Sequence, residues 1–73
     1  MILDCLGERC PRPIITLARA ARGAAPGLVI TLHTDDPAAI VDIPAWCRMR
    51  GHGCRRLDDD ARGAVHEVTI AQL

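Results

Sequence analysis

The sequence predicts an α+β domain, a two-layer sandwich in which two helices cover one face of a four-stranded sheet. Three observations support this prediction. The 73 residues are enough for one domain, spanning residues 1–73. Apolar residues recur at helical spacing in two segments, and short strand-like segments flank them in the order β-α-β-α-β-β. Because amphipathic helices must bury one side, packing both on the same sheet face is the compact arrangement.

The first half of the chain predicts a strand, a helix and a second strand. Residues 2–5 indicate a short opening strand, and Gly7 indicates the turn after it. A helix is predicted from about Pro11 to Ala24. Its apolar residues fall at i, i+3, i+4, i+7 and i+11, namely Ile14, Leu17, Ala18, Ala21 and Ala25. Residues 28–34 alternate in the pattern of a half-buried strand.

The second half predicts an interrupted helix and two strands. Residues 35–37 (Asp-Asp-Pro) are a helix-start signal, in which acidic capping residues precede a proline. The helix should extend to Arg50, but Pro44 lacks an N–H group, so we expect a kink or restart just before it, at Asp42 or Ile43. Two further strands, joined by a polar loop at 58–63, are predicted at residues 54–58 and 65–71.

Cys10 is the candidate reactive residue, because it stands immediately before a predicted helix. Pro11 and Pro13 suit the first turn of that helix, which would make Cys10 the N-cap. An N-cap sulfur lies at the positive end of the helix dipole, where a thiolate is stabilised, and Arg9 and Arg12 would act in the same direction. The missing N–H of Pro13 would weaken this effect. The alternative interpretation is that Cys10 is a small apolar residue filling space at a helix start.

Composition narrows the classes of function. The formal charge is zero, and Trp46 is the only Phe, Tyr or Trp residue, which disfavours nucleic-acid modules built on basic faces and stacked rings. A chain this short has little room for a deep catalytic cavity, so we expect it to present one reactive group to a larger partner. No apolar run approaches the ~20 residues of a membrane span, and no leader pattern opens the sequence, which predicts a cytoplasmic protein.

Four cysteines stand at positions 5, 10, 47 and 54. In a secreted domain they would suggest two disulfides, but without an export signal we predict free thiols in a reducing compartment. Their spacing is not that of ordinary zinc knuckles, so no metal site is expected. We interpret Cys47 as a core residue and assign no role to Cys5 or Cys54.

Two blocks of the sequence resemble one known family. The first consists of Leu3-Asp4, Gly7 and the CPxP run Cys10-Pro11-Arg12-Pro13. The second consists of Asp35-Asp36-Pro37, Asp42-Ile43-Pro44-Ala45-Trp46-Cys47 and Gly51-His52. Together they resemble the signature of the TusA-like (SirA) sulfur-carrier proteins over nearly the whole chain. A CPxP run alone is a weak signal, whereas its combination with the second block is specific.

The resemblance implies a mixed sheet and a fold related to the C-terminal domain of translation initiation factor three. It also implies that Cys10 carries sulfane sulfur as a persulfide, received from a cysteine desulfurase or a rhodanese-like or DsrE-like donor. The sulfur would pass to a DsrE-like or thiolation-complex acceptor, for tRNA wobble-uridine thiolation, molybdenum-cofactor maturation or sulfur oxidation. We therefore expect a monomeric sulfurtransferase that acts with partner enzymes, without other cofactors and without direct nucleic-acid or membrane contact.

Physical reasoning supports a carrier independently of the resemblance. No second cysteine stands at C-x-x-C spacing from Cys10, so bound sulfur would not be resolved immediately as a disulfide. One departure from the family is Glu8, where leucine is common, because it adds a negative charge near Cys10. Two other functions remain open: a non-catalytic interaction or regulatory module, and a thiol redox module with a Cys5–Cys10 bridge.

Several further residues have two open interpretations. Asp35 and Asp36 are expected to cap the second helix, with partner contact as the alternative. Asp42, Trp46 and His52 could form a docking face. Alternatively, Asp42 caps the restarted helix and Trp46 covers a small core, while His52 is expected to cap the end of the helix. His52 could assist Cys10 in proton transfer only if the fold brings them together. The arginines at 48, 50, 55 and 56 are expected to be solvated and opposed by Asp58–Asp60, or to steer an acidic partner.

Overall fold

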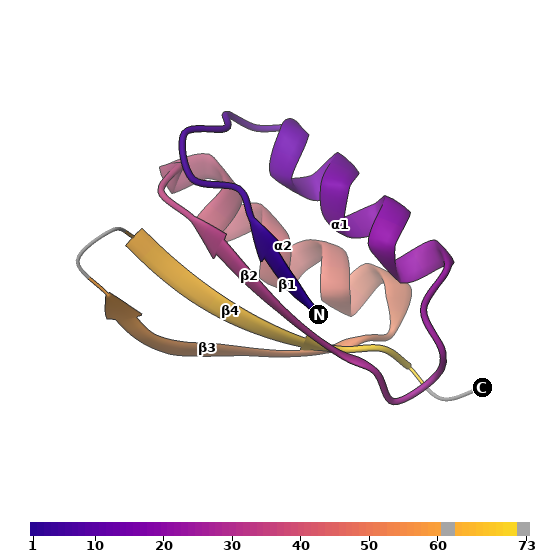
Figure 1. Cartoon of the computed structure of the whole chain (residues 1–73). Coiled ribbons are helices and arrows are strands. Elements are labelled where there is room, and N and C mark those ends of the chain that lie inside the picture. The colour runs from indigo at the N-terminus through magenta and orange to yellow at the C-terminus, as the bar shows by residue number, and fades with distance from the viewer. Residues whose placement is uncertain (61–62, 72–73) are drawn as a thin grey trace.

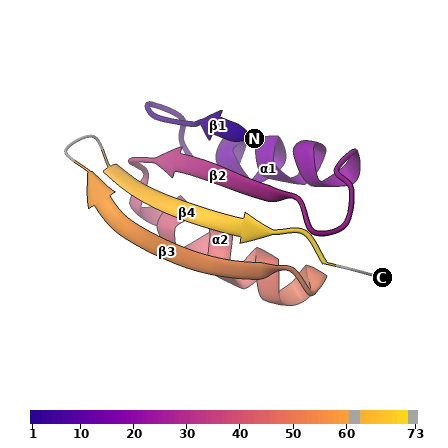
Figure 2. The same ribbon diagram turned by 60° about the horizontal axis from the view of Figure 1, so that its bottom comes forward.

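Two helices lie side by side on one face of a four-stranded sheet in the computed structural model (Figures 1 and 2). The structure describes residues 1–60 and 63–71. In that part of the chain the elements follow the predicted order: β1 (Ile2–Asp4), α1 (Arg12–Arg22), β2 (Val29–Thr34), α2 (Pro37–Arg50), β3 (Gly53–Asp60) and β4 (Gly63–Thr69). The predicted two-layer α+β sandwich is confirmed.

The strand order β1-β2-β4-β3 places both helices in parallel crossovers. β1 pairs parallel with β2, while β4 pairs antiparallel with both β2 and β3, so β3 runs in the same direction as β2. Each helix therefore connects two strands that point the same way, and must itself run back in the opposite direction. Consequently the N-terminal ends of α1 and α2 lie at one end of the helical layer and their C-terminal ends at the other (Figure 1).

The core lies between the helices and the sheet. Its largest fully buried apolar side chains are Leu17 from α1, Ile30 and Leu32 from β2, Ile43 from α2 and Val68 from β4. Burial of a side chain of this size contributes roughly 1.5–3 kcal/mol, so this shared layer holds both helices on the sheet. The alternation predicted for β2 is confirmed, because Ile30 and Leu32 are buried while Val29 is exposed.

The helix restart predicted before Pro44 does not occur. α2 continues from Pro37 to Arg50 with Pro44 inside it, although a proline there removes one N–H group from the helical hydrogen-bond ladder. The physical reason is tertiary packing. The buried residues of α2 recur every four positions and form one continuous face: Ala39, Ile43 and Cys47. Packing of that face outweighs the single hydrogen bond that is lost.

Gly51 ends α2, as the sequence predicts. Its φ of 78° lies in the left-handed region that glycine favours, and the next N–H, from His52, donates to the Cys47 carbonyl at 2.8 Å. α2 is the longer helix with 14 residues. No helix in the described part of the chain has the length and apolar content needed to cross a membrane.

Several predicted boundaries are wrong. β4 spans Gly63–Thr69 rather than residues 65–71, and β1 ends at Asp4. α1 ends at Arg22 rather than near Ala24, because Gly23 already takes the C-cap position. β3 extends to Asp60, so the backbone of residues 58–60 belongs to a strand rather than to the predicted loop. Residues 61–62 of that loop lie outside the described residues.

Candidate functional site

Cys10 lies where the N-terminal ends of α1 and α2 meet, and it is partly exposed. It is not the N-cap residue that the sequence predicts, because Pro11 occupies that position. A turn closed by Arg12 N–H donating to the Arg9 carbonyl at 2.9 Å precedes the first helical bond, from Ile15 to Pro11 at 3.0 Å. Cys10 therefore lies inside a turn that leads into the helix.

Two aspartates from distant parts of the chain hold Cys10. Its backbone N–H donates to Oδ2 of Asp36 at 2.7 Å, and its Sγ donates to Oδ2 of Asp42 at 3.0 Å. Asp36 is only 7% exposed, and its own N–H donates to Oγ1 of Thr34 at 3.2 Å. The cysteine is thus fixed to the start of α2 through both its backbone and its thiol.

The acidic pair before α2 does not cap that helix, contrary to the prediction. Asp36 stands at the N-cap position but makes no side-chain capping bond, because its carboxylate accepts the Cys10 N–H instead. Asp35 accepts the N–H of Gly7 at 3.0 Å. Gly7 has a φ of 81°, a conformation that glycine adopts without a side-chain clash. The pair therefore secures the β1–α1 loop, whose N–H groups need partners.

The electrostatics at Cys10 oppose the thiolate that the sequence predicts. The hydrogen bond to the Asp42 carboxylate raises the pKa of the Cys10 thiol, and partial burial and the negative charges of Asp42 and Asp36 act in the same direction. Arg9 and Arg12, which were expected to favour the thiolate, are exposed to solvent, where their charges are screened. The contacts of Cys10 therefore favour its neutral thiol form over the thiolate.

This arrangement can move a proton. A carboxylate oxygen 3.0 Å from Sγ is close enough to accept the thiol proton directly. Sequence reasoning gave Asp42 a docking or capping role and missed this contact. The available signal was topological, since two parallel crossovers bring the first turns of both helices together and Asp42 lies in the second turn of α2.

The other three cysteines belong to the packed interior or border it. Cys5 and Cys47 are completely buried, which confirms the interpretation of Cys47 as core, and Cys54 packs against the core. Burial and Glu8 raise the pKa of Cys5 to about 11, while burial and Cys54 raise the pKa of Cys47 to about 12. Glu8 thus acts on Cys5 rather than on Cys10. All four thiols are free.

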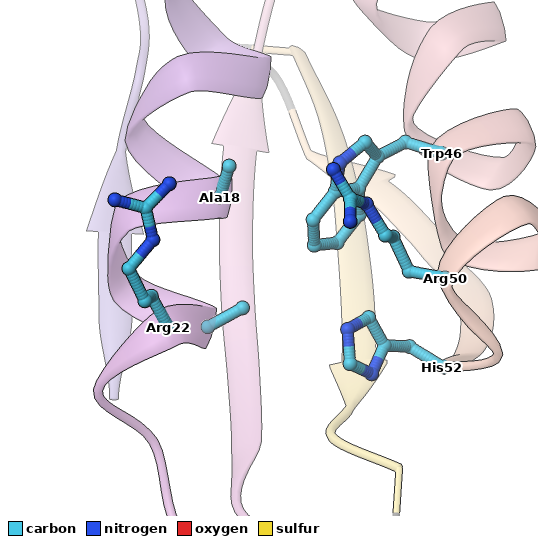
Figure 3. Close-up of a pocket in the computed structure, with 6 residues that line it drawn as sticks. Ala18, Arg22, Trp46, Arg50 and His52 are labelled. Carbon is cyan, nitrogen blue, oxygen red and sulfur yellow. The ribbon is translucent and has the colours of Figure 1, made fainter.

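Trp46 and His52 lie at the opposite end of the helices, where they line a pocket of about 190 Å³ (Figure 3). Their ring centroids are 5.2 Å apart, and Nδ1 of His52 accepts the N–H of Ala71 at 2.9 Å. The fold therefore brings Asp42 to Cys10 but does not bring His52 there. Proton transfer between His52 and Cys10, which the sequence left open, has no support in this structure.

The remaining predicted site residues shape the loop before α1 or lie on the surface. Pro13 is buried in the first turn of α1 and Pro11 is exposed ahead of it, so both shape the loop that carries Cys10. Arg55 pairs with Glu67 at 3.7 Å on the exposed surface. The predicted opposition by residues 58–60 concerns side chains outside those described. Among the side chains that the structure describes, which exclude those of residues 58–62, no group of three His, Cys, Asp or Glu residues could hold a metal ion.

Comparison with known proteins agrees with the resemblance in the sequence. Residues 1–71 match the family model described as "Sulfurtransferase TusA". The fold is similar to the crystal structure of a SirA-like protein from Desulfitobacterium hafniense, with a TM-score of 0.84. The two chains are 24% identical, and the match covers 99% of this chain and 100% of that one. At this identity the structural likeness concerns the fold alone.

Proposed function

This chain belongs to the TusA sulfurtransferase family, and we propose that it is a sulfur carrier that accepts sulfane sulfur as a persulfide on Cys10 and relays it to an acceptor protein. The observation that carries this proposal is the pairing of a partly exposed thiol with a carboxylate 3.0 Å away. The thiol is accessible enough to react with a partner, and the carboxylate can take its proton at the moment of reaction.

Loading is a sulfur-exchange reaction between two proteins. The Cys10 sulfur attacks the outer sulfur of a persulfide on the donor protein. A new S–S bond forms on Cys10 as the donor's S–S bond breaks, and the electron pair leaves with the donor's cysteine sulfur. The Cys10 proton passes through Asp42 to that departing thiolate, so the step uses neither an oxidant nor a reductant.

Handover repeats the exchange in the other direction. A thiolate of the acceptor attacks the outer sulfur of the Cys10 persulfide, and Cys10 departs as a thiolate that takes a proton back. Between encounters the hydrogen bond to Asp42 keeps Cys10 in its neutral form. Because the thiolate is the form that alkylating agents and oxidants attack, this contact protects the carrier while it is free.

We propose the partners that the family resemblance implies. The donor is a cysteine desulfurase or a rhodanese-like protein, and the acceptor is a DsrE-like protein or a thiolation complex. The carrier acts as a monomer with no cofactor other than the covalently held sulfur. Direct nucleic-acid contact at the site is not expected, because the carboxylates of Asp35, Asp36 and Asp42 near Cys10 would repel phosphates.

Persulfide mapping tests the proposal. After incubation with a cysteine desulfurase and cysteine, mass spectrometry should find the added mass of one or more sulfur atoms on the peptide that contains Cys10. Cys10→Ser should abolish this labelling. Cys54→Ser is the matched control, because Cys54 is also partly exposed but lies away from the aspartates, and it should label normally. Labelling that persists in Cys10→Ser, on Cys47 or Cys54, would contradict the assignment.

A non-catalytic interaction module is the second candidate. It predicts that Cys10→Ser keeps partner binding and function, so the same variant separates the two. A Cys5–Cys10 redox bridge has weaker support, because Cys5 is fully buried and its thiol lies near Glu8 and Thr16.

A further inference from the structure

The sulfur-transfer steps proposed above do not use the pocket between the C-terminal ends of α1 and α2. It is lined by Ala18, Ala21, Arg22, Trp46, Arg50 and His52. Asp42, Trp46 and Arg50 follow one another at i, i+4 and i+8 along α2, so the pocket begins one helical turn beyond the Cys10 contact and extends about 12 Å from it. It is therefore a separate feature of the same helical layer.

The polar groups around this pocket are donors. Arg22 and Arg50 carry guanidinium groups, and neither forms an ion pair with any residue that the structure describes. No carboxylate is among the lining residues. Figure 3 shows Arg50, Trp46 and His52 extending toward α1, while Arg22 lies along α1 with its guanidinium group on the side away from them.

One hydrogen bond also fixes His52 as a donor. Because Nδ1 of His52 accepts the N–H of Ala71 at 2.9 Å, the neutral imidazole must carry its proton on Nε2. Figure 3 shows this second nitrogen pointing toward α1. The pocket therefore combines the positive charge of Arg50 with a ring N–H held in a defined direction, and Arg22 adds a second charge at its α1 border. Together these groups form a donor set for an oxyanion.

We propose that this pocket binds a small oxyanion attached to a flat apolar body, such as an aromatic carboxylate or phosphate. The oxyanion would lie between the guanidinium group of Arg50 and Nε2 of His52, on the side of the pocket that faces Arg22. The flat body would lie against Trp46, and the small side chains of Ala18 and Ala21 leave room for it on the α1 side.

Size and helix electrostatics sharpen the proposal. A volume of about 190 Å³ is below the roughly 300–1,000 Å³ of sites for drug-sized ligands, so a single-ring compound is the appropriate scale. Both helices end here, and their C-terminal ends carry partial negative charge. An anion is therefore attracted only while the arginines outweigh the helix dipoles, and binding should depend strongly on Arg50.

Trp46 is a built-in reporter for this binding. It is the single tryptophan, and the chain has no tyrosine, so its fluorescence comes from the pocket alone. Benzoate and phenyl phosphate should each change its emission in a saturable manner, while neutral benzamide should not. A response to only one of the two anions also supports the proposal and identifies the oxyanion as a carboxylate or a phosphate.

Arginine variants decide whether the response belongs to the pocket. Arg50→Ala should weaken binding about tenfold, as expected for the loss of a charge-assisted hydrogen bond, and Arg22→Ala should weaken it less. Arg48→Ala and Arg19→Ala are matched controls, since both arginines are exposed in the last turns of the same helices but do not line the pocket. Equal weakening in the controls, equal binding of benzamide, or no saturable response to either anion would overturn the proposal.

Discussion

At the N-terminal end of the helix pair two carboxylates hold a cysteine, one through its backbone N–H and one through its thiol, whereas at the C-terminal end two arginines and two rings line a pocket. Both ends follow the same rule, because helix dipoles favour negative groups at N-termini and positive groups at C-termini. The two ends differ in whether their charged side chains already have a partner. At the N-terminal end the helix dipoles stabilise the carboxylates of Asp36 and Asp42. Because these negative charges raise the pKa of Cys10, its neutral form is favoured. At the second end the arginines have no acidic partner among the described residues and remain available.

The largest effect is expected from a substitution in the core, which holds both ends of the helix pair on the sheet. Ile43→Ala should lower the free energy of unfolding by about 2–5 kcal/mol, because Ile43 is completely buried between α2 and the sheet. A small domain has only a few kcal/mol in total, so both ends should lose their structure together. Urea denaturation followed by Trp46 fluorescence measures this. Val41→Ala is the control on the same helix, since Val41 is 69% exposed, and a comparable loss there would contradict the packing interpretation.

Alkaline pH should destabilise the protein because two thiols, those of Cys5 and Cys47, are completely buried. The unfolded thiols ionise near pH 9, whereas the folded pKa is about 11 for Cys5 and about 12 for Cys47. The folded state therefore holds more protons above about pH 9, and the free energy of unfolding should fall by up to about 1.4 kcal/mol per pH unit for each thiol. Below that pH the two thiols contribute no slope.

Single cysteine variants show which thiol causes the fall in the free energy of unfolding at alkaline pH. Cys5→Ala should remove the part of the slope that comes from the β1–α1 end, and Cys47→Ala the part from the end of α2. Denaturation midpoints measured from about pH 8 to about pH 10 provide the test. Slopes that are unchanged in both variants would show that other groups titrate.

Asp42→Asn should separate the two effects of the carboxylate on Cys10. Removing its charge lowers the pKa of the thiol, so alkylation of Cys10 by iodoacetamide at neutral pH should become several-fold faster. Loading from the sulfur donor should nevertheless become slower, because the proton acceptor is lost. Asp35→Asn is the control, since that carboxylate bonds Gly7 rather than Cys10. Slower alkylation in Asp42→Asn would show that the aspartate does not hold the thiol neutral.

The smallest effect is expected when a substitution in the pocket is tested for its influence on Cys10, at the other end of the helix pair. Arg50→Ala should leave the alkylation rate of Cys10 and its pH profile unchanged, because Arg50 is exposed and lies about two helical turns along α2 from Asp42, the residue that contacts Cys10. The same alkylation assay measures this. A shift in the profile would show that the charges of the pocket reach the thiol.

Prediction from sequence succeeded where the signals are local. Helical spacing, strand alternation and Gly51 identified the elements in their correct order, and the Cys10-Pro11-Arg12-Pro13 run located the thiol ahead of the first helix. It failed at Pro44, where the rule that proline breaks a helix was outweighed by the packing of Ile43 and Cys47. It also failed for the state of Cys10, since the dipole argument considered only its own helix.

The sequence alone determined the two-layer architecture, the family and the position of a thiol before the first helix, because periodicity and turn residues act over a few neighbouring positions. Only the tertiary structure decided which groups face that thiol. Asp36 and Asp42 lie 26 and 32 positions away from Cys10, and they reach it because two parallel crossovers align the starts of both helices. The same alignment brings the ends of the helices together and creates the pocket around Trp46. Contacts between distant segments depend on how the layers pack, and no local pattern records that.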